Sequence, residues 1–298
     1  MKKNNKNIFI GIIVFLLFLV GLEAAWIIKK ADSEKEEKSD EWDFEVDKQI
    51  AESFETALSD GSIEVWFQPI CDPNTDKTVG GEGLSRWKDG ENYISPGVFV
   101  PTLEATGQVR QLDKNVFIKA CEFQKERLGK QELFPISVNL SALSATEEGV
   151  VEEYKEILDS CGLPKGCINI EVTESLDAES RMLADLVEDL HTAGFLVEID
   201  DFGAGYSAYS DLVDIAYDIL KIDKSIIDKI GTERGNEVAS TIIDMAHRLG
   251  MSVIAEGVES KEQVDLLKEM KCDAIQGYYY SKPLSHDDFC NYLAGKAE

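Results

Sequence analysis

The chain has 298 residues, of which 44% are hydrophobic, and its formal net charge is −27. A chain of this length and hydrophobic content can form a globular protein with a packed core. The negative charge argues against a nucleic acid polymer as a partner, because such a surface gains no counterion-release attraction to a polyanion.

An apolar segment near the N-terminus predicts a membrane anchor. Residues 8–28 are apolar except for Glu23, and a helix of this length spans about 30 Å, the hydrocarbon core of a bilayer. A signal peptide is the alternative, since lysines precede the segment. No small-x-small cleavage site follows, however, and Trp26 with Lys29 and Lys30 is typical of a membrane interface. Residues 1–30 are therefore predicted to be an N-terminal membrane anchor with one transmembrane helix.

A charged linker and a single large domain are predicted to follow the anchor. Residues 31–42 carry charge without apolar periodicity, which indicates a solvated tether. The domain then covers residues 43–298 and begins with a helix over residues 44–58. The six cysteines lack close metal-type spacing, so we expect reduced thiols, most of them buried.

Short strands alternate with helices along the rest of the chain. The predicted strands are residues 64–70, 79–87, 134–140, 168–172, 195–200, 219–223, 251–256 and 274–276. The short link at residues 72–77 predicts that the first two strands form an antiparallel hairpin, whereas the later alternation predicts parallel strands. About eight strands in roughly 240 residues indicate an α/β fold, a TIM-like (β/α)8 barrel with an antiparallel first strand.

Two of the intervening helices show an apolar face and a glycine stop. The first, over residues 179–193, ends before Gly194 and the second ends before Gly250. The predicted buried faces are Leu183, Leu186, Val187 and Leu190 in the first helix, and Val238, Ile242, Met245 and Leu249 in the second.

Polar residues fall on the inward side of the predicted strands. Strands 134–140 and 168–172 alternate apolar and polar residues, and in a barrel the apolar side packs on the helices. The inward layer at the mouth of the barrel would contain Glu82, Asn139, Glu171, Asp200, Lys221, Glu256 and Gln276. This oxygen-rich set, with no suitable histidine or cysteine nearby, suits Mg²⁺ or Mn²⁺.

Asp200 and Asp201 stand side by side at the end of a buried strand. Burying two adjacent carboxylates is costly unless a cation lies between them or a loop lets both reach water. The converging polar residues of the other strands favour the cation.

Eight segments give the chain a family resemblance. They are Phe67-Gln-Pro-Ile70, Glu82-Gly-Leu-Ser-Arg-Trp87, Ser137-Val-Asn-Leu-Ser141, Glu171-Val-Thr-Glu-Ser175, Asp200-Asp-Phe-Gly-Ala-Gly-Tyr206, Leu220-Lys-Ile-Asp223, Ala255-Glu-Gly-Val-Glu259 and Gln276-Gly-Tyr278. In order and spacing they resemble the EAL-domain cyclic-di-GMP phosphodiesterases over about residues 45–295. The resemblance implies metal-dependent hydrolysis of cyclic-di-GMP to linear pGpG.

The resemblance also implies roles for individual residues. The ligands of two divalent cations, Mg²⁺ or Mn²⁺, would be Glu82, Asn139, Glu171, Asp200 and Asp201, with Asp200 bridging both ions. Lys221 and Glu256 would orient and deprotonate the attacking water, and Glu174 would hold the loop after the aspartate pair. The residues that contact the substrate would be Gln68, Arg86, Glu259 and Gln276.

Three positions depart from the family pattern. Gly83 replaces the middle alanine of the signature, Ala204 replaces a threonine or serine, and Glu198 stands where a small residue is frequent. Ala204 removes a hydroxyl that could fix the loop, and Glu198 adds a carboxylate on the inward side.

Two other functions are weighed against the enzyme. The first is a catalytically weak or inactive receptor that binds cyclic-di-GMP, and the retained ligand residues argue against it. The second is a glycosidase barrel with paired carboxylates, which does not explain Asn139, Lys221 and the adjacent aspartates together. Because cyclic-di-GMP is a cytoplasmic messenger, the barrel is expected on the cytoplasmic side of the inner membrane, anchored by a single pass. Dimers are frequent in the family, so a homodimer is a candidate assembly.

Overall fold

A computed structural model describes residues 46–130, 133–173, 180–204 and 211–295. The chain divides into two units, Met1–Ser53 and Phe54–Glu298, and each is described by itself. Residues 46–53 of the first unit are helical. The predicted anchor and the linker at 31–42 lie outside the described residues. In the part of the chain that is described, no helix is both long and apolar enough to cross a membrane.

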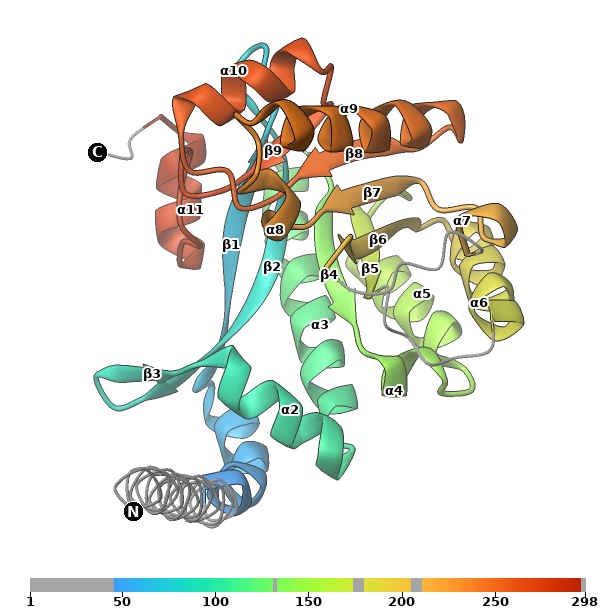
Figure 1. The fold of residues 1–298 in the computed structure, drawn as a ribbon. Coiled ribbons are helices and arrows are strands. Elements are labelled where there is room, and N and C mark those ends of the chain that lie inside the picture. Colours follow the sequence, from blue (N-terminus) through green and yellow to red (C-terminus); the bar gives the residue numbers. More distant parts are fainter. Residues whose placement is uncertain (1–45, 131–132, 174–179, 205–210, 296–298) are drawn as a thin grey trace, which may run out of the picture. The chain divides into compact units, whose positions relative to one another are not determined.

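The second unit contains a closed β-barrel surrounded by helices (Figure 1). After helical residues 54–60, its strands are β1 Ile63–Cys71, β2 Thr78–Asp89, β3 Asn92–Ile94, β4 Ile136–Leu140, β5 Ile168–Thr173, β6 Leu196–Phe202, β7 Ile219–Ile222, β8 Ser252–Ala255 and β9 Ala274–Gln276. Its named helices are α2 Pro96–Thr106, α3 Val109–Leu128, α4 Ala142–Ala145, α5 Val150–Cys161, α6 Ser180–Ala193, α7 Asp211–Asp214, α8 Lys224–Ile227, α9 Glu233–Arg248, α10 Lys261–Glu269 and α11 His286–Leu293.

The strand order confirms the predicted TIM-like barrel. The order is β1-β9-β8-β7-β6-β5-β4-β2-β3, and β1 also pairs with β2, which closes the ring. β1 is antiparallel to both of its neighbours, whereas the pairs from β2–β4 around to β8–β9 are parallel. The short strand β3 was not predicted, and it extends the hairpin of β1 and β2 by pairing with the end of β2.

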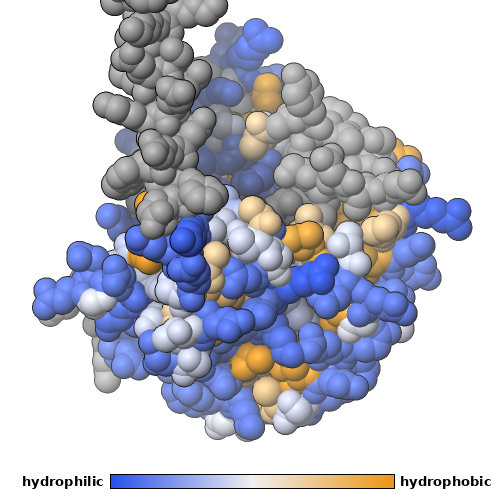
Figure 2. Space-filling view, turned by 90° about the horizontal axis from the view of Figure 1, so that it is seen from below, coloured by the Kyte–Doolittle hydropathy of each residue, from blue (hydrophilic) through white to orange (hydrophobic). Residues whose placement is uncertain are grey.

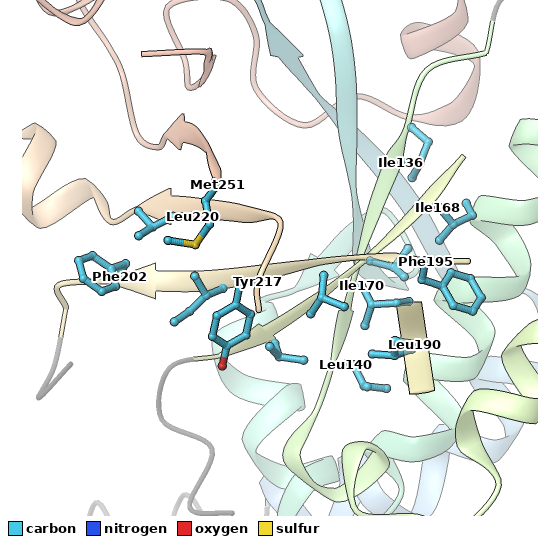
Figure 3. Close-up of a cluster of buried hydrophobic side chains, with 14 of the residues drawn as sticks. Ile136, Leu140, Ile168, Ile170, Leu190, Phe195, Phe202, Tyr217, Leu220 and Met251 are labelled. Atoms are coloured by element: carbon cyan, nitrogen blue, oxygen red, sulfur yellow. The ribbon is translucent and has the colours of Figure 1, made fainter. Parts of the chain in front are cut away.

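The apolar side of the strands faces the helices, as predicted. Figure 3 shows Ile136, Ile168 and Ile170 of adjacent strands lying together with Phe195 and with Leu190 of α6, and all five are buried. This continuous core leaves only the opposite side of each strand for the barrel interior. The alternation along the strands therefore decides which polar residues meet inside.

One predicted helix face is confirmed and the other is confirmed only in part. The four leucine and valine residues predicted for α6 are all buried, and Gly194 ends the helix with a φ of 102°. Of the residues predicted for the face of α9, Ile242 is buried and Met245 is partly buried, but Val238 is 44% exposed and Leu249, which directly follows the helix, is 51% exposed. The other buried residues of this helix are Gly235, Ala239, Ile243 and Ala246. The buried face is therefore centred on small alanines and two isoleucines, with Val238 and Leu249 at its edges.

The surface and the cysteines agree with the composition. Figure 2 shows one face of the molecule, on which hydrophilic residues predominate and hydrophobic residues form small, separate patches. All six cysteines are free, and four of them are buried. The expectation of reduced, mostly buried thiols is confirmed.

Candidate active site

The polar residues predicted for the mouth of the barrel come together. Asn139, Glu171, Asp200, Lys221 and Gln276 lie on β4, β5, β6, β7 and β9, Glu256 directly follows β8, and Glu82 lies within β2. Five of the seven line a cavity of about 350 Å³, and Glu171 joins them through its ion pair with Lys221. Asn139 joins the group through Glu82, because its Nδ2 donates to Glu82 Oε1 at 3.1 Å.

Lys221 is the centre of this cluster. Its side chain is fully buried, and its Nζ lies 2.7 Å from Glu256 Oε1, 2.9 Å from Asp200 Oδ1, 3.1 Å from Glu171 Oε1 and 3.7 Å from Glu82 Oε2. Burial alone would lower the pKa of Lys221, but the surrounding carboxylates, Glu171 foremost, raise it well above its usual value. The lysine is therefore charged and partly neutralises four acids.

Two glutamines connect the cluster to β1. Gln276 Nε2 donates to Glu82 Oε2 at 2.5 Å and to Gln68 Oε1 at 3.2 Å. Gln68 Nε2 donates to the carbonyl oxygen of Ser281 at 3.2 Å. Both glutamines line the cavity, so their amide groups form one wall of it.

The end of β6 has an unusual backbone that serves the aspartate pair. Its pairing with β7 shifts between Ile199 and Phe202, and Asp201 has a φ of 55°, in the left-handed region. Successive strand residues normally point to opposite faces. Here, carboxylate oxygens of Asp200, Asp201 and Glu256 all lie within 4.8 Å of one another. The distortion therefore gathers charge that a regular strand would separate.

The cluster contains more acids than its lysine can neutralise. Burial raises the pKa of Glu171 well above its usual value and that of Glu256 to about 8, although Lys221 acts in the opposite sense on both. Partial burial, with Asp200 beside it, also raises the pKa of Asp201. Glu171 Oε2 is buried without a hydrogen-bond donor among the described residues. Such an excess of oxygen ligands fits hard divalent cations.

The other predicted substrate-binding residues lie farther out. Arg86 lines a neighbouring cavity of about 310 Å³, where its Nη1 donates to the carbonyl oxygen of Ser85 at 2.8 Å and its guanidinium lies 5.7 Å from the ring centre of Trp66. Burial lowers the pKa of Arg86, and Glu82 opposes this shift. Glu259 is exposed at the rim of the main cavity. Glu174 lies outside the described residues.

Sequence reasoning missed two features of this site. Lys224 lines the cavity, and its Nζ lies 3.1 Å from Glu259 Oε1 and 2.7 Å from Asp228 Oδ1. Its position directly after the Leu220–Asp223 motif could have indicated it. Glu198, which had no assigned role, is fully buried in the barrel, where its Oε1 accepts hydrogen bonds from Ser137 and Asn169. All three residues fall on the inward side of their strands in the sequence alternation, and this pattern could have indicated that they meet.

Comparisons with known proteins identify the family. The EAL domain model matches residues 51–283. The chain is 35% identical over 240 residues to the cyclic di-GMP phosphodiesterase NbdA of Pseudomonas aeruginosa, covering 79% of this chain and 31% of that protein. It is 30% identical over 291 residues to the probable cyclic di-GMP phosphodiesterase PdeG of Escherichia coli, covering 96% of this chain and 55% of that protein.

A solved structure agrees with this assignment. The PaMucR phosphodiesterase in complex with c-di-GMP has a TM-score of 0.76 at 28% identity, and the match covers 81% of this chain and 99% of that one. The chain spans about a third of the length of NbdA and about half that of PdeG. The chain belongs to the EAL domain family.

Proposed function

We propose that this chain is a metal-dependent phosphodiesterase that hydrolyses cyclic-di-GMP to linear pGpG and so lowers the level of this second messenger. The observation that carries the proposal is the convergence of Glu82, Glu171, Asp200 and Glu256 on Lys221 at the mouth of an EAL-domain barrel. The names of NbdA and PdeG and the c-di-GMP complex of PaMucR support the choice of substrate.

Two divalent cations, Mg²⁺ or Mn²⁺, are the proposed cofactors. The residues proposed to hold them are Glu82, Asn139, Glu171, Asp200 and Asp201. When bound, such cations neutralise a phosphodiester and lower the pKa of water. At this end of the barrel, acidic side chains outnumber positively charged ones, and Glu171 Oε2 is buried without a hydrogen-bond donor among the described residues. Both observations support the proposal.

Glu256 and Lys221 are proposed to handle the proton of the attacking water. Hydrolysis joins the water oxygen to phosphorus and breaks one P–O3′ bond, so one proton leaves the water and one reaches the departing oxygen. Glu256 is the proposed proton acceptor, because a carboxylate oxygen of Glu256 lies within 4.8 Å of those of Asp200 and Asp201, which are proposed to hold the cations. Lys221 holds this carboxylate at 2.7 Å and stabilises its ionised form.

Four residues are proposed to position the substrate. Gln68 and Gln276 offer amide donors and acceptors to a guanine edge from one wall of the cavity. Arg86 supplies a forked donor for a phosphate group, and Glu259 offers an acceptor at the rim. Glu174 is proposed to hold the loop after the aspartate pair, a role that concerns residues outside those described.

A product assay separates the enzyme from a receptor. The full chain in detergent would be incubated with cyclic-di-GMP and Mg²⁺ or Mn²⁺, the products would be separated by chromatography, and binding would be measured in parallel in Ca²⁺. We expect pGpG in both activating metals and its loss on chelation. Binding of cyclic-di-GMP without any pGpG would replace the enzyme with a receptor.

The location of the chain is a separate proposal. The apolar residues 8–28 support a single-pass anchor in the inner membrane, with the barrel in the cytoplasm where cyclic-di-GMP is found. Limited proteolysis of intact spheroplasts should leave the barrel undigested. Digestion from outside would contradict this location.

A homodimer is the proposed assembly, and light scattering of the purified chain would test it.

A further inference from the structure

A second polar layer lies beneath the proposed cation ligands. Ser137, Asn169 and Glu198 each come two residues before a ligand on the same strand, namely Asn139 on β4, Glu171 on β5 and Asp200 on β6. Because strand side chains alternate, each of the three points to the same inward side as the ligand above it. All three are buried, and Glu198 is 0% exposed.

Glu198 is held in place by the other two members of this layer. Its Oε1 accepts a hydrogen bond of 2.7 Å from Ser137 Oγ and another of 2.7 Å from Asn169 Nδ2. These two donors come from different strands, β4 and β5, so they restrict the carboxyl group from two directions. A side chain fixed in this way has one orientation available for its second oxygen, Oε2.

The carboxyl group of Glu198 lies beside the ligand layer. Glu198 is the partner of Glu171 in the register of β5 and β6, and the two carboxyl groups interact electrostatically. Glu198 Oε2 and Glu171 Oε2 are both buried without a donor among the described residues. The side chains of Glu198 and Glu171 interact with each other inside the barrel.

Stability alone does not explain a carboxyl group at this position. Burying an acid beside other acids is costly, and an apolar side chain of similar volume would fill the same space without that cost. The hydrogen bonds from Ser137 and Asn169 offset only part of it. The arrangement does explain how Glu171 can be kept in one orientation, because residues that contact metal ligands commonly orient them.

We propose that Glu198, fixed by Ser137 and Asn169, is a positioning residue that orients the carboxylate of Glu171 for divalent cation binding. This inference rests on the proposed function, since it concerns the same cations. Glu198 does not contact the substrate; it acts through Glu171. Its contribution is the contact that its fixed side chain makes with Glu171, so an amide of the same shape can replace it.

Mn²⁺ affinity of full-chain variants tests this proposal. Calorimetric titration with Mn²⁺ would compare the wild type, Glu198→Leu, Glu198→Gln and the exposed control Glu188→Leu. We expect Glu198→Leu to bind Mn²⁺ about 10- to 100-fold more weakly, as when other residues supporting metal ligands are removed. Glu198→Gln should retain most of the affinity, because its carbonyl still accepts two hydrogen bonds and its amide can donate to Glu171. Glu188→Leu should match the wild type.

Turnover and stability supply the remaining readouts. In Glu198→Leu, kcat should fall with little change in KM at saturating Mn²⁺, and the unfolding transition should stay cooperative. If that variant does not fold, Ser137→Ala decides the question, because it removes one donor to Glu198 and should weaken Mn²⁺ binding in the same direction.

Three results would overturn the proposal. They are wild-type Mn²⁺ affinity in Glu198→Leu, wild-type affinity in Ser137→Ala if Glu198→Leu does not fold, and an equal loss in Glu198→Gln and Glu198→Leu, which would assign the effect to charge. A wild type that binds no Mn²⁺ would instead refute the proposed function, and this inference with it.

Discussion

Lys221 Nζ lies 2.7 Å from Glu256 Oε1 inside the barrel, and the lysine side chain is fully buried. The same ammonium group also contacts Glu171 and Asp200. A buried cation with several carboxylate partners cannot be removed without leaving those carboxylates uncompensated. The pair therefore links the stability of the barrel to the chemistry proposed at its mouth.

Replacing Lys221 by methionine should affect both properties. We expect Lys221→Met to lower the free energy of unfolding of the chelated protein by about 3–5 kcal/mol, because buried acids lose their partner. Turnover should fall by about 10²- to 10⁴-fold with the loss of a group that handles the proton. Denaturant unfolding and pGpG formation measure the two effects. Lys261→Met removes only an exposed pair with Asp265. This control should change the free energy of unfolding by no more than about 1 kcal/mol and turnover by no more than about twofold. Near-wild-type turnover in Lys221→Met would contradict the assignment.

Glu256 should make the stability of the chelated protein depend on pH. Its pKa is raised to about 8 in the folded chain and would return to about 4.3 on unfolding. The folded state therefore binds the proton more tightly, so this contribution is complete below the unfolded pKa and is lost as pH rises through about 8. The melting temperature should fall between about pH 5 and pH 9, and Glu256→Gln should flatten this fall. An unchanged slope in Glu256→Gln would assign the dependence to other acids.

Asp201 should matter for activity and little for stability. Asparagine tolerates the left-handed backbone at φ 55°, so Asp201→Asn should unfold within about 0.5 kcal/mol of the wild type. Because an amide lacks the full charge of a carboxylate, turnover should fall about tenfold or more and require more Mn²⁺. Asp76→Asn is a matched control, since Asp76 has a φ of 54° in the hairpin link. A Mn²⁺ requirement equal to that of the wild type would remove Asp201 from the cation site.

Gly83 should accept the alanine that the family signature carries. A Cβ at this position would lie 3.5 Å from Val65 Cγ1 and 3.6 Å from the carbonyl oxygen of Ser137, which are ordinary contacts. Gly83→Ala should therefore stabilise the fold by about 0.4–1 kcal/mol by restricting the unfolded chain. Gly81→Ala is the comparison, because its Cβ would lie 3.1 Å from Phe289 and 3.2 Å from Ile136. Denaturant unfolding in which Gly83→Ala is no more stable than Gly81→Ala would contradict the packing argument.

The strands and the inward residues could be predicted because alternation is a local property. Polar residues between apolar ones mark the inside of a barrel whatever their partners are. Glu198 shows the limit of this reasoning. The alternation showed that Glu198 faces inward. Its hydrogen bonds to Ser137 and Asn169, however, depend on the register of three strands, which no single segment determines.

Other differences also come from tertiary packing. Strand β3 has only three residues and too little alternation to be recognised. The buried face of α9 includes the small residues Ala239 and Ala246, so choosing the largest apolar residues identified Ile242 correctly but wrongly included Val238 and Leu249. Arg86 was expected to contact the substrate, and the side-chain packing that places it in a neighbouring cavity is not evident from its motif.

Binding and turnover in Asp200→Asn test the central claim most directly. Asp200 contacts Lys221 at 2.9 Å and shares a cluster with Asp201 and Glu256, so its negative charge is proposed to be essential for cation binding and hydrolysis. The full chain and this variant would be compared for cyclic-di-GMP binding, thermal unfolding and pGpG formation in Mn²⁺. We predict that the wild type forms pGpG and that a folded Asp200→Asn forms it at a rate lower by at least about 100-fold. Equal rates in the two proteins, or a wild type that binds cyclic-di-GMP and forms no pGpG, would contradict the account.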